Sequence, residues 1–212
     1  EEVAHELEDF AALTARTVRT VILANKALAL TWLGVSDIYQ GSETTRTSLV
    51  DPDNRRPVDY SVLTNILERL DSGAAPRNLD EDKLFLTSRL ARLRASRPNT
   101  FVGPRSGYRT IPVTTSFAFA YTRLLDEVPD VVVIVRRLSR RLEQLGGWRE
   151  ESVVLPEGTW EDVLHGSTVE GGHQPLAEVV GDAPVVVLAK IPTKATTCNP
   201  SQPDQSSEGA AP

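Results

Sequence analysis

The period of the hydrophobic residues changes near residue 100, and this change limits the folds that the chain can adopt. Before it, apolar residues recur at the three- and four-residue steps of amphipathic helices. After it, they form short β-prone runs separated by proline and glycine. The sequence therefore predicts a first part built on helices and a second part that is all-β. At 212 residues, the chain is long enough for one or two domains with a real core.

Three helices are expected before residue 100. The first has an apolar stripe that includes Leu7, Phe10, Val18 and Val21, and its second half is apolar almost all round, as expected of a helix packed between a sheet and other elements. The third has an acidic first turn and a basic last turn, which complement the helix dipole. Asp59 is suited to cap the second helix. The expected helices cover residues 3–30, residues 58 or 59 to 70, and residues 80–96.

A short apolar run, Val35 to Tyr39, lies between the first two helices and predicts a buried parallel strand. At Gly41 the chain opens into a polar loop that reaches Asp59. A strand, a polar loop and a helix form the repeating unit of a (β/α)₈ barrel, whose functional groups lie at the carboxyl ends of the strands. Since nothing else in the first part can pair with this strand, we expect a preceding barrel segment to be missing from the chain.

Six short β-prone runs follow residue 100, and their spacing is typical of a small β-sandwich. Beyond residue 191 the chain is rich in Pro, Ser, Thr and Gln without apolar periodicity, which predicts a disordered tail. The expected strands are residues 107–113, 116–122, 131–136, 152–155, 160–163 and 185–188.

The predicted fold class is therefore α/β plus all-β. The last helix, strand and helix units of a (β/α)₈ barrel are followed by a small C-terminal β-sandwich domain. The expected divisions are residues 1–78 for the end of the barrel, 79–98 for a connecting helix, 99–191 for the sandwich and 192–212 for the tail.

Composition narrows the possible partners. The net charge of −6 gives no reason to expect a nucleic acid partner, and no apolar run is long enough to predict a membrane span. Cys198 is the single cysteine, so an intramolecular disulfide is impossible and a cytoplasmic location is expected. The three histidines lack metal-ligand spacing, so neither a metal site nor a cofactor is expected. The absence of methionine favours a processed or truncated product.

The polar loop carries the best candidates for binding chemistry. Asp51 and Arg55 stand four residues apart, so that a carboxylate and a guanidinium can face one cleft and bracket sugar hydroxyls, which both donate and accept. Alternatively, they pair with each other or cap the next helix. The residues alone support a polar site for a sugar- or phosphate-sized ligand on an α/β unit, and no more.

The amino-acid sequence of this loop resembles that of a known protein family. The motif I-Y-Q-G-S-E at residues 38–43, followed by L-V-D-P-D-N-R-R-P-V-D at residues 49–59, is similar to the last barrel strand and loop of the maltooligosyltrehalose synthases, members of the α-amylase superfamily. Similarity continues at residues 82–98, 107–109 and 155–171 in the same order. One departure is Ser36, where the family has proline, and it concerns strand rigidity more than chemistry.

The resemblance implies an intramolecular transglycosylase that turns the reducing-end α-1,4 linkage of a maltooligosaccharide into an α,α-1,1 linkage. Its mechanism is of the retaining kind, with a carboxylate nucleophile and a carboxylic acid. In this superfamily those carboxylates lie on earlier barrel strands, so we expect no catalytic residue in this chain and no activity of the chain alone. The implied partners are an α-glucan substrate, the missing N-terminal barrel segment and, in the pathway, a maltooligosyltrehalose trehalohydrolase.

The resemblance also implies roles for residues of the loop. Asp51 and Arg55 match residues that contact a bound glucose beyond the cleavage point. For Arg56 the alternative is a surface ion pair. Tyr39 and Glu43 flank the strand exit and can line the cleft floor, although a core position for Tyr39 and an orienting role for Glu43 are alternatives. The expected substrate-binding residues are Tyr39, Glu43, Asp51, Asn54, Arg55 and Arg56.

Several alternatives remain open from the sequence. The run R-R-L-S-R-R-L at residues 136–142 is either an anion or RNA patch or, as we favour, a solvated strand end and turn. Trp148 and Trp160 could stack on sugar, but core packing is favoured. The pair Gly171-Gly172 predicts a turn. The alternative functions are another α-amylase-superfamily hydrolase or transglycosylase, and a non-catalytic carbohydrate-binding module.

Overall fold

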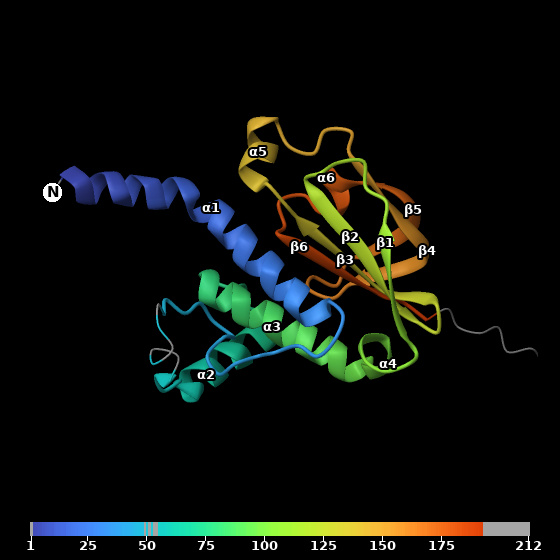
Figure 1. Cartoon of the computed structure of the whole chain (residues 1–212), viewed down its shortest axis with the longest axis horizontal. Helices are drawn as coiled ribbons and strands as arrows, with labels where there is room; N and C mark the ends of the chain where they lie inside the picture. Colours follow the sequence, from blue (N-terminus) through green and yellow to red (C-terminus); the bar gives the residue numbers. More distant parts are fainter. Residues whose placement is uncertain (1, 49, 51, 53–54, 193–212) are drawn as a thin grey trace, which may run out of the picture.

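The computed structural model describes residues 2–48, 50, 52 and 55–192, and it shows helices packed against one antiparallel sheet (Figure 1). The helices are α1 (Glu2–Thr31), α2 (Tyr60–Asp71), α3 (Leu79–Ser96), α4 (Pro98–Phe101), α5 (Ser139–Gln144) and α6 (Leu176–Val179). The strands are β1 (Ser106–Ile111), β2 (Ala118–Leu125), β3 (Val128–Arg136), β4 (Ser152–Asp162), β5 (Thr168–Pro175) and β6 (Val185–Lys190). Within the described chain, no helix has the length and apolar character that a membrane span needs.

The three long helices confirm the helical periods of the sequence. The carboxylate of Asp59 accepts hydrogen bonds from the backbone N–H groups of Ser61 and Val62 at 3.1 and 3.2 Å, as predicted for an N-cap. The bond from the Ser61 hydroxyl, together with those backbone bonds, holds the pKa of Asp59 below its usual value. Asn78 caps α3 in the same way, accepting from the Glu81 N–H at 3.0 Å. Local side-chain chemistry therefore fixes where α2 and α3 begin.

The six strands form one sheet in the order β1-β2-β3-β6-β4-β5, and every pair is antiparallel. The register of β4 shifts between Leu155 and Thr159, so its second half pairs with β6 while its first half lies beside the segment after β1. There, Val153 bridges to Val113. The sheet therefore curls until the segment after β1 meets the first half of β4, and the prediction of a small β-sandwich is wrong because the six strands form one sheet. The bend in β4 replaces the second sheet.

Strand β5 is missing from the sequence prediction because Gly171 and Gly172 indicated a turn. In the structure both glycines lie within β5, opposite the bend of β4. A Cβ atom on Gly171 would lie 2.5 Å from the carbonyl oxygen of Pro156 and 2.7 Å from the Cα of Glu157. Glycine is needed here so that the bent strand can approach its neighbour closely.

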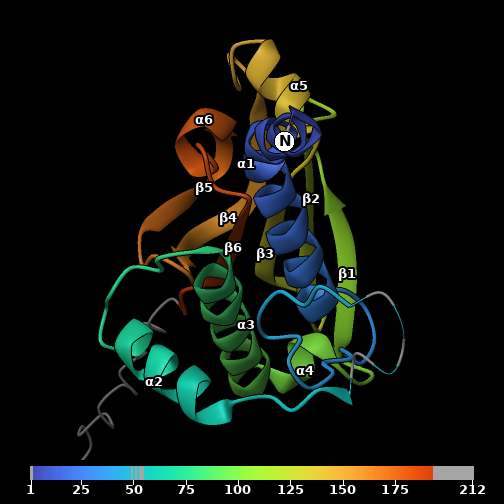
Figure 2. The same ribbon diagram turned by 90° about the vertical axis from the view of Figure 1, so that its left-hand side faces the viewer.

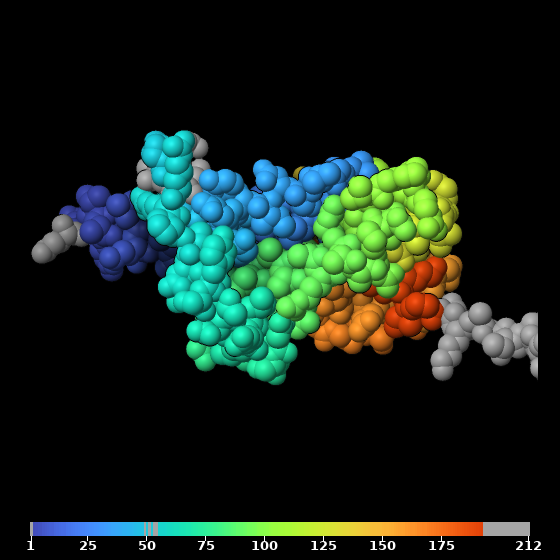
Figure 3. All heavy atoms as spheres, turned by 90° about the horizontal axis from the view of Figure 1, so that it is seen from below, coloured from blue at the N-terminus to red at the C-terminus, as the bar shows by residue number. Residues whose placement is uncertain are grey.

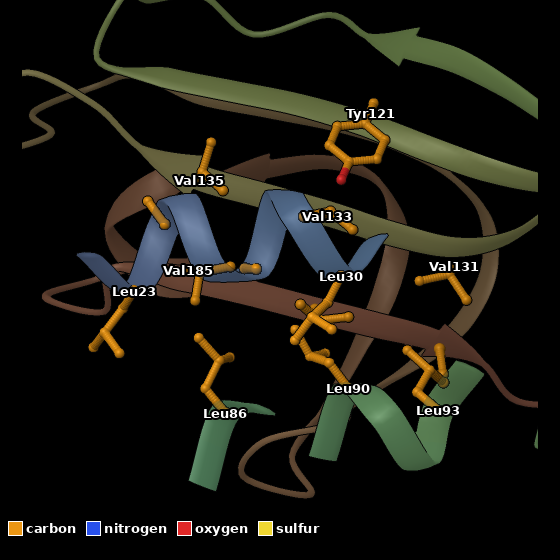
Figure 4. Close-up of a cluster of buried hydrophobic side chains, with 14 of the residues drawn as sticks. Leu23, Leu30, Leu86, Leu90, Leu93, Tyr121, Val131, Val133, Val135 and Val185 are labelled. Carbon is orange, nitrogen blue, oxygen red and sulfur yellow. The ribbon is translucent and has the colours of Figure 1, made fainter. Parts of the chain in front are cut away.

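Both faces of the sheet are buried, because successive residues of β3 and β6 point in opposite directions. Val131, Val133 and Val135 face α1 and α3, where they pack against leucines such as Leu30 and Leu90 (Figure 4). The alternate residues of β3 face the inside of the curled sheet. There they pack with Trp148 and Trp160, which are 6% and 0% exposed, so the prediction of core packing for both tryptophans is confirmed.

Helix α1 has two unlike halves. From Thr20 onward one side of the helix is buried against the sheet and α3, whereas its first half projects away from the rest of the chain (Figure 1). The predicted apolar stripe is therefore not a core face throughout. Leu7, Phe10, Val18 and Val21 are 64, 61, 45 and 51% exposed.

The expected strand Val35 to Tyr39 is absent, and that prediction is wrong for this structure. The segment has no regular secondary structure and no strand partner among the described residues, and Val35 is 87% exposed. All six strands in the described part of the chain belong to the curled antiparallel sheet, and none of them pairs with this segment. A lone strand cannot satisfy its backbone groups.

The run of arginines after β3 also differs from its prediction. Strand β3 ends at Arg136 as expected, but Ser139–Gln144 forms α5 instead of a turn. Gly146 and Gly147, with φ values of 85° each, then reverse the chain. The predicted disordered tail lies outside the described residues, apart from Pro192.

Candidate functional site

The loop between α1 and α2 carries most of the predicted binding residues, and it lies over the outside of the helical part (Figure 3). Its first half is docked on α1 and α3 by side chains of those helices. The Lys26 ammonium donates to the Ser42 hydroxyl at 3.3 Å, and the Lys83 ammonium donates to the Thr44 carbonyl at 2.8 Å. One residue further on, the backbone N–H of Thr45 donates to Asp80 at 2.7 Å. Two helices therefore fix the path of the loop.

Two lysines, Lys26 buried and Lys83 half-buried, interact with one carboxylate in this docking contact. Burial lowers the pKa of Lys26, the Lys83 charge lowers it further, and Glu43 opposes both effects. Burial likewise lowers the pKa of Lys83, which Asp80 and Glu43 oppose. The Oε2 atom of Glu43 is buried without a hydrogen-bond partner among the described residues, and the orienting role that the sequence alternative gave to Glu43 stays a prediction. Its contribution to the docking contact is electrostatic.

Arg46 closes the loop on itself. Its guanidinium donates to the carbonyl oxygens of Gln40 at 3.2 Å and of Arg56 at 3.4 Å. It packs against Gly41, where φ is +79° and where an added Cβ would lie 2.0 Å from the Arg46 Nη1 atom. The glycine thus allows both the turn and the close approach of the arginine.

A hollow of about 340 Å³ opens beside this arginine, at the start of α2. The residues that line it are polar ones, Thr44, Arg46, Arg56 and Asp59, and apolar ones that include Val58, Val62 and Leu63. This mixture of donors and acceptors around an open hollow suits a ligand rich in hydroxyl groups.

The structure places the six predicted site residues unequally. Arg56 lines the hollow, whereas Arg55, Tyr39 and Glu43 are not among the residues that line it. Tyr39 is 52% exposed, so the core alternative for this residue is wrong here. The predictions for Asp51 and Asn54 lie outside the described residues.

Sequence reasoning missed three residues that shape the loop: Lys26, Arg46 and Lys83. A signal for Lys26 exists, since it is the single charge among residues 21–33, in the most apolar part of α1. The signal was overlooked because hydrophobic periodicity counts apolar positions and ignores an isolated cation. Lys83 lies directly after an acidic turn and is hidden by the expected helix-dipole pattern.

No group of three or more potential metal ligands occurs among residues 2–48, 50, 52 and 55–192. His165 pairs instead with Asp162, its Nδ1 lying 2.8 Å from the carboxylate.

Comparison with known proteins gives a consistent result, although no protein-family model matches the chain. A protein of Mycobacterium tuberculosis named as a maltooligosyl trehalose synthase is 39% identical over 174 residues, which cover 79% of this chain. The solved structure of maltooligosyltrehalose synthase from Arthrobacter ramosus covers 90% of the chain at 31% identity with a TM-score of 0.80. A DSM5389 glycosyltrehalose synthase shares the fold at a TM-score of 0.63 and 22% identity.

The chain is much shorter than these proteins. It covers 20% of the M. tuberculosis protein and 25% of the A. ramosus chain. The part that it matches is the C-terminal region, and the match includes both the helices and the curled sheet. Sequence and fold therefore place the chain in the maltooligosyltrehalose synthase family, as a counterpart of its C-terminal region.

Proposed function

We propose that the chain is the C-terminal part of an enzyme that converts the reducing-end α-1,4 linkage of maltooligosaccharides into an α,α-1,1 linkage. The observation that carries the proposal is the relation to maltooligosyltrehalose synthases over 79% of the chain in sequence and 90% in structure. The reaction is an intramolecular transglycosylation of the retaining kind, with its two carboxylates outside this chain.

The share of the chain in this reaction is to bind sugar through the loop between α1 and α2. Thr44, Arg46 and Arg56 present a hydroxyl and guanidinium groups at the hollow beside α2. Further polar residues of the same loop, Asp51, Asn54 and Arg55, are close to Arg56 in the sequence. A hydrogen bond from a charged group to a sugar hydroxyl contributes about 1.5–3 kcal/mol, so two or three such contacts are enough to hold one glucose unit.

A preceding barrel segment covers the exposed apolar surface of the helical part. Val35, Ile38 and Tyr39 are 87, 39 and 52% exposed, and the first half of α1 adds Leu7 and Phe10. Large apolar side chains exposed at these two places mark contacts with another protein segment. In the complete enzyme residues 35–39 then form the last barrel strand, because neighbouring strands supply the missing backbone partners.

The proposal also assigns a role to each of the domains expected from the sequence. Residues 1–78 close the barrel, residues 79–98 connect it to the sheet, and residues 99–191 brace it from outside. The enzyme acts in the cytoplasm, and a maltooligosyltrehalose trehalohydrolase uses its product.

A carbohydrate-binding module is the alternative that the structure disfavours. Such modules present a row of exposed aromatic rings on a sheet. Here Trp148 and Trp160 are buried, and the other aromatic rings of the described sheet, including Tyr108 and Tyr121, pack against Trp32.

The proposal is tested by product analysis of the complete enzyme, wild type and Asp51→Ala, on maltopentaose. Loss of reducing ends without chain shortening supports linkage isomerisation, while a gain of reducing ends means hydrolysis and overturns it. Arg56→Ala should raise KM by about tenfold, the effect of losing roughly 1.4 kcal/mol of binding. Arg109→Ala, which removes a guanidinium that is 59% exposed on the distant strand β1, is the matched control and should leave KM unchanged.

A further inference from the structure

The sequence run R-R-L-S-R-R-L lines a second hollow, far from the sugar loop in the chain. The hollow measures about 520 Å³ and lies between α1 and the segment from Arg136 to Gln144, which includes α5. Figures 1 and 2 both show α5 beside α1, and an ion pair between Arg16 and Glu143 joins the two helices at 3.5 Å. An adjoining hollow shares Val21 and Leu138 and extends the cavity along α1. We call this cavity the arginine groove.

The charges around the arginine groove are unbalanced. Arg16 and Arg136 are matched by Glu143 and Asp182, which lie 2.9–3.6 Å from them. Arg137, Arg140 and Arg141 remain, all exposed, and none of them has an ion pair among the residues that the structure describes. Three uncompensated guanidiniums on one rim are unexpected in a chain whose net charge is −6.

Two buried polar groups beside the groove also lack partners. Arg136 and Ser139 both line it and are 4 and 2% exposed, yet the Nε of Arg136 and the Oγ of Ser139 make no hydrogen bond. Buried donors are nearly always satisfied, so two unsatisfied donors in the wall of one groove leave a capacity for hydrogen bonds that no described residue uses. This observation is independent of the exposed rim.

The chemistry of the groove selects the kind of ligand. Planar guanidiniums bind phosphate oxygens through paired hydrogen bonds, and the neighbouring hydroxyls of Thr17 and Ser139 add donors. Val21 and Leu138 supply an apolar wall for the rest of a small molecule. An apolar protein surface placed over the rim would bury three charged groups without partners, which costs free energy. Single-stranded nucleic acids stack their bases on several aromatic rings, whereas the half-buried Phe119 is the one aromatic residue among those that line the groove.

We propose that the arginine groove binds a small phosphate-bearing molecule, about the size of a phosphorylated sugar. The phosphate lies against Arg137, Arg140 and Arg141, and the remainder of the molecule lies along α1. This inference does not depend on the proposed function, because it rests on residues that take no part in the sugar loop.

The test is calorimetric titration of the chain with inorganic phosphate and with glucose 6-phosphate, at constant ionic strength set with chloride. Both should bind, and the double variant Arg137→Gln/Arg140→Gln should weaken binding by at least about tenfold, the loss expected for two charged contacts. Arg109→Gln removes a guanidinium that is 59% exposed on strand β1, and it should leave the affinity unchanged. Ser139→Ala tests the buried donor and should weaken binding by a smaller factor.

Three results would overturn the inference. The first is absence of phosphate binding by the folded chain. The second is an equal loss of affinity in Arg109→Gln and in the double variant, which means general charge attraction. The third is tighter binding of a short single-stranded RNA or of anionic lipid vesicles than of glucose 6-phosphate, with the same dependence on Arg137 and Arg140, which assigns the groove to a macromolecular partner.

Discussion

The curled sheet and the loop between α1 and α2 lie in the same chain but are stabilised in opposite ways. Each face of the sheet has its own core, and residues such as Val133, Leu188 and Trp160 are fully buried. The loop is held by a few polar contacts to Lys26, Lys83 and Asp80, and its apolar residues are exposed. The sheet is therefore complete within the chain, whereas the loop keeps apolar surface for contacts that the described residues do not supply.

The largest expected effect tests this contrast directly. Trp160 is 0% exposed and its Nε1 donates to the Pro156 carbonyl at 2.8 Å, so Trp160→Ala should lower the free energy of unfolding by about 3–5 kcal/mol. Tyr39 is 52% exposed in the loop, so Tyr39→Ala should change it by less than about 0.5 kcal/mol. Urea denaturation at a constant m-value measures both.

The same two substitutions can be compared in a longer protein that includes a preceding barrel segment. If a barrel segment covers residues 35–39, Tyr39→Ala becomes a core substitution there and should cost about 2 kcal/mol or more, while the cost of Trp160→Ala stays unchanged. A large cost of Tyr39→Ala in the chain alone would contradict the contrast, since the loop would then be a packed element.

The second prediction concerns Tyr121, where the sheet meets α1. Its hydroxyl lies 2.6 Å from the Thr31 hydroxyl, and burial raises its pKa to about 12. An unfolded tyrosine ionises near pH 10, so between about pH 10 and 12 the folded state keeps a proton that the unfolded state loses. This contribution is present in full below pH 10 and is lost as the pH rises through 12. It amounts to about 2.7 kcal/mol for two pKa units.

Tyr121→Phe isolates this contribution. Between pH 9 and pH 12 the wild type should lose about 2 kcal/mol more unfolding free energy than the variant, because the other tyrosines are common to both and the folded Tyr121 is half ionised at pH 12. Parallel curves for the two proteins over this range would mean that the contact between the sheet and α1 is open to solvent.

The contrast between sheet and loop also explains what the sequence predicted. Helix boundaries followed from caps such as Asp59 and from 3.6-residue periodicity, and the strands from alternating or continuous apolar runs, because these signals are local. The bend of β4, the pairing of β5 and the exposure of Val35 depend on residues far apart in the chain, which no local pattern contains. Gly171 shows the difference, since the same residue indicates a turn locally and a close strand contact in the fold.

The sequence predicted which loop carries the candidate site, but it did not predict the contacts that hold this loop on the helices. The polar loop was found from its composition and from the I-Y-Q-G-S-E motif at residues 38–43. Lys26 and Lys83 were missed because they act from helices, across 16 and 39 positions in the chain. Their contribution depends on tertiary packing, and a helical wheel shows them only as polar positions.

The third prediction tests that docking contact. Lys83→Met removes the bond to the Thr44 carbonyl, which should release the loop locally by roughly 1.4 kcal/mol and speed trypsin cleavage after Arg46 about tenfold. Cleavage after Arg149, in the exposed turn following Gly147, is the internal control and should not change. Equal acceleration at both sites would mean global destabilisation, and the anchoring role of Lys83 would be wrong.

The smallest expected effect lies at the rim of the sheet, in the turn between β4 and β5. A hydrogen bond from His165 Nδ1 to Asp162 raises the pKa of His165. A raised histidine pKa stabilises the fold below the unfolded value near 6.5, and this stabilisation is lost as the pH rises through the folded value. Since the His165 side chain is 61% exposed, the contribution should stay below about 1 kcal/mol.

An NMR titration of His165 in the wild type and in Asp162→Asn measures this effect. The pKa of His165 should fall in the variant, because the asparagine keeps the shape of the turn but removes the charge. Glu161→Gln removes a charge from the adjacent, exposed position of β4 and should leave the titration of His165 unchanged. If both variants lower the pKa equally, the general charge of the sheet rim sets it instead of the Asp162 contact. The turn would then be held loosely, as the loop between α1 and α2 is, and the sheet would be rigid only at its two cores.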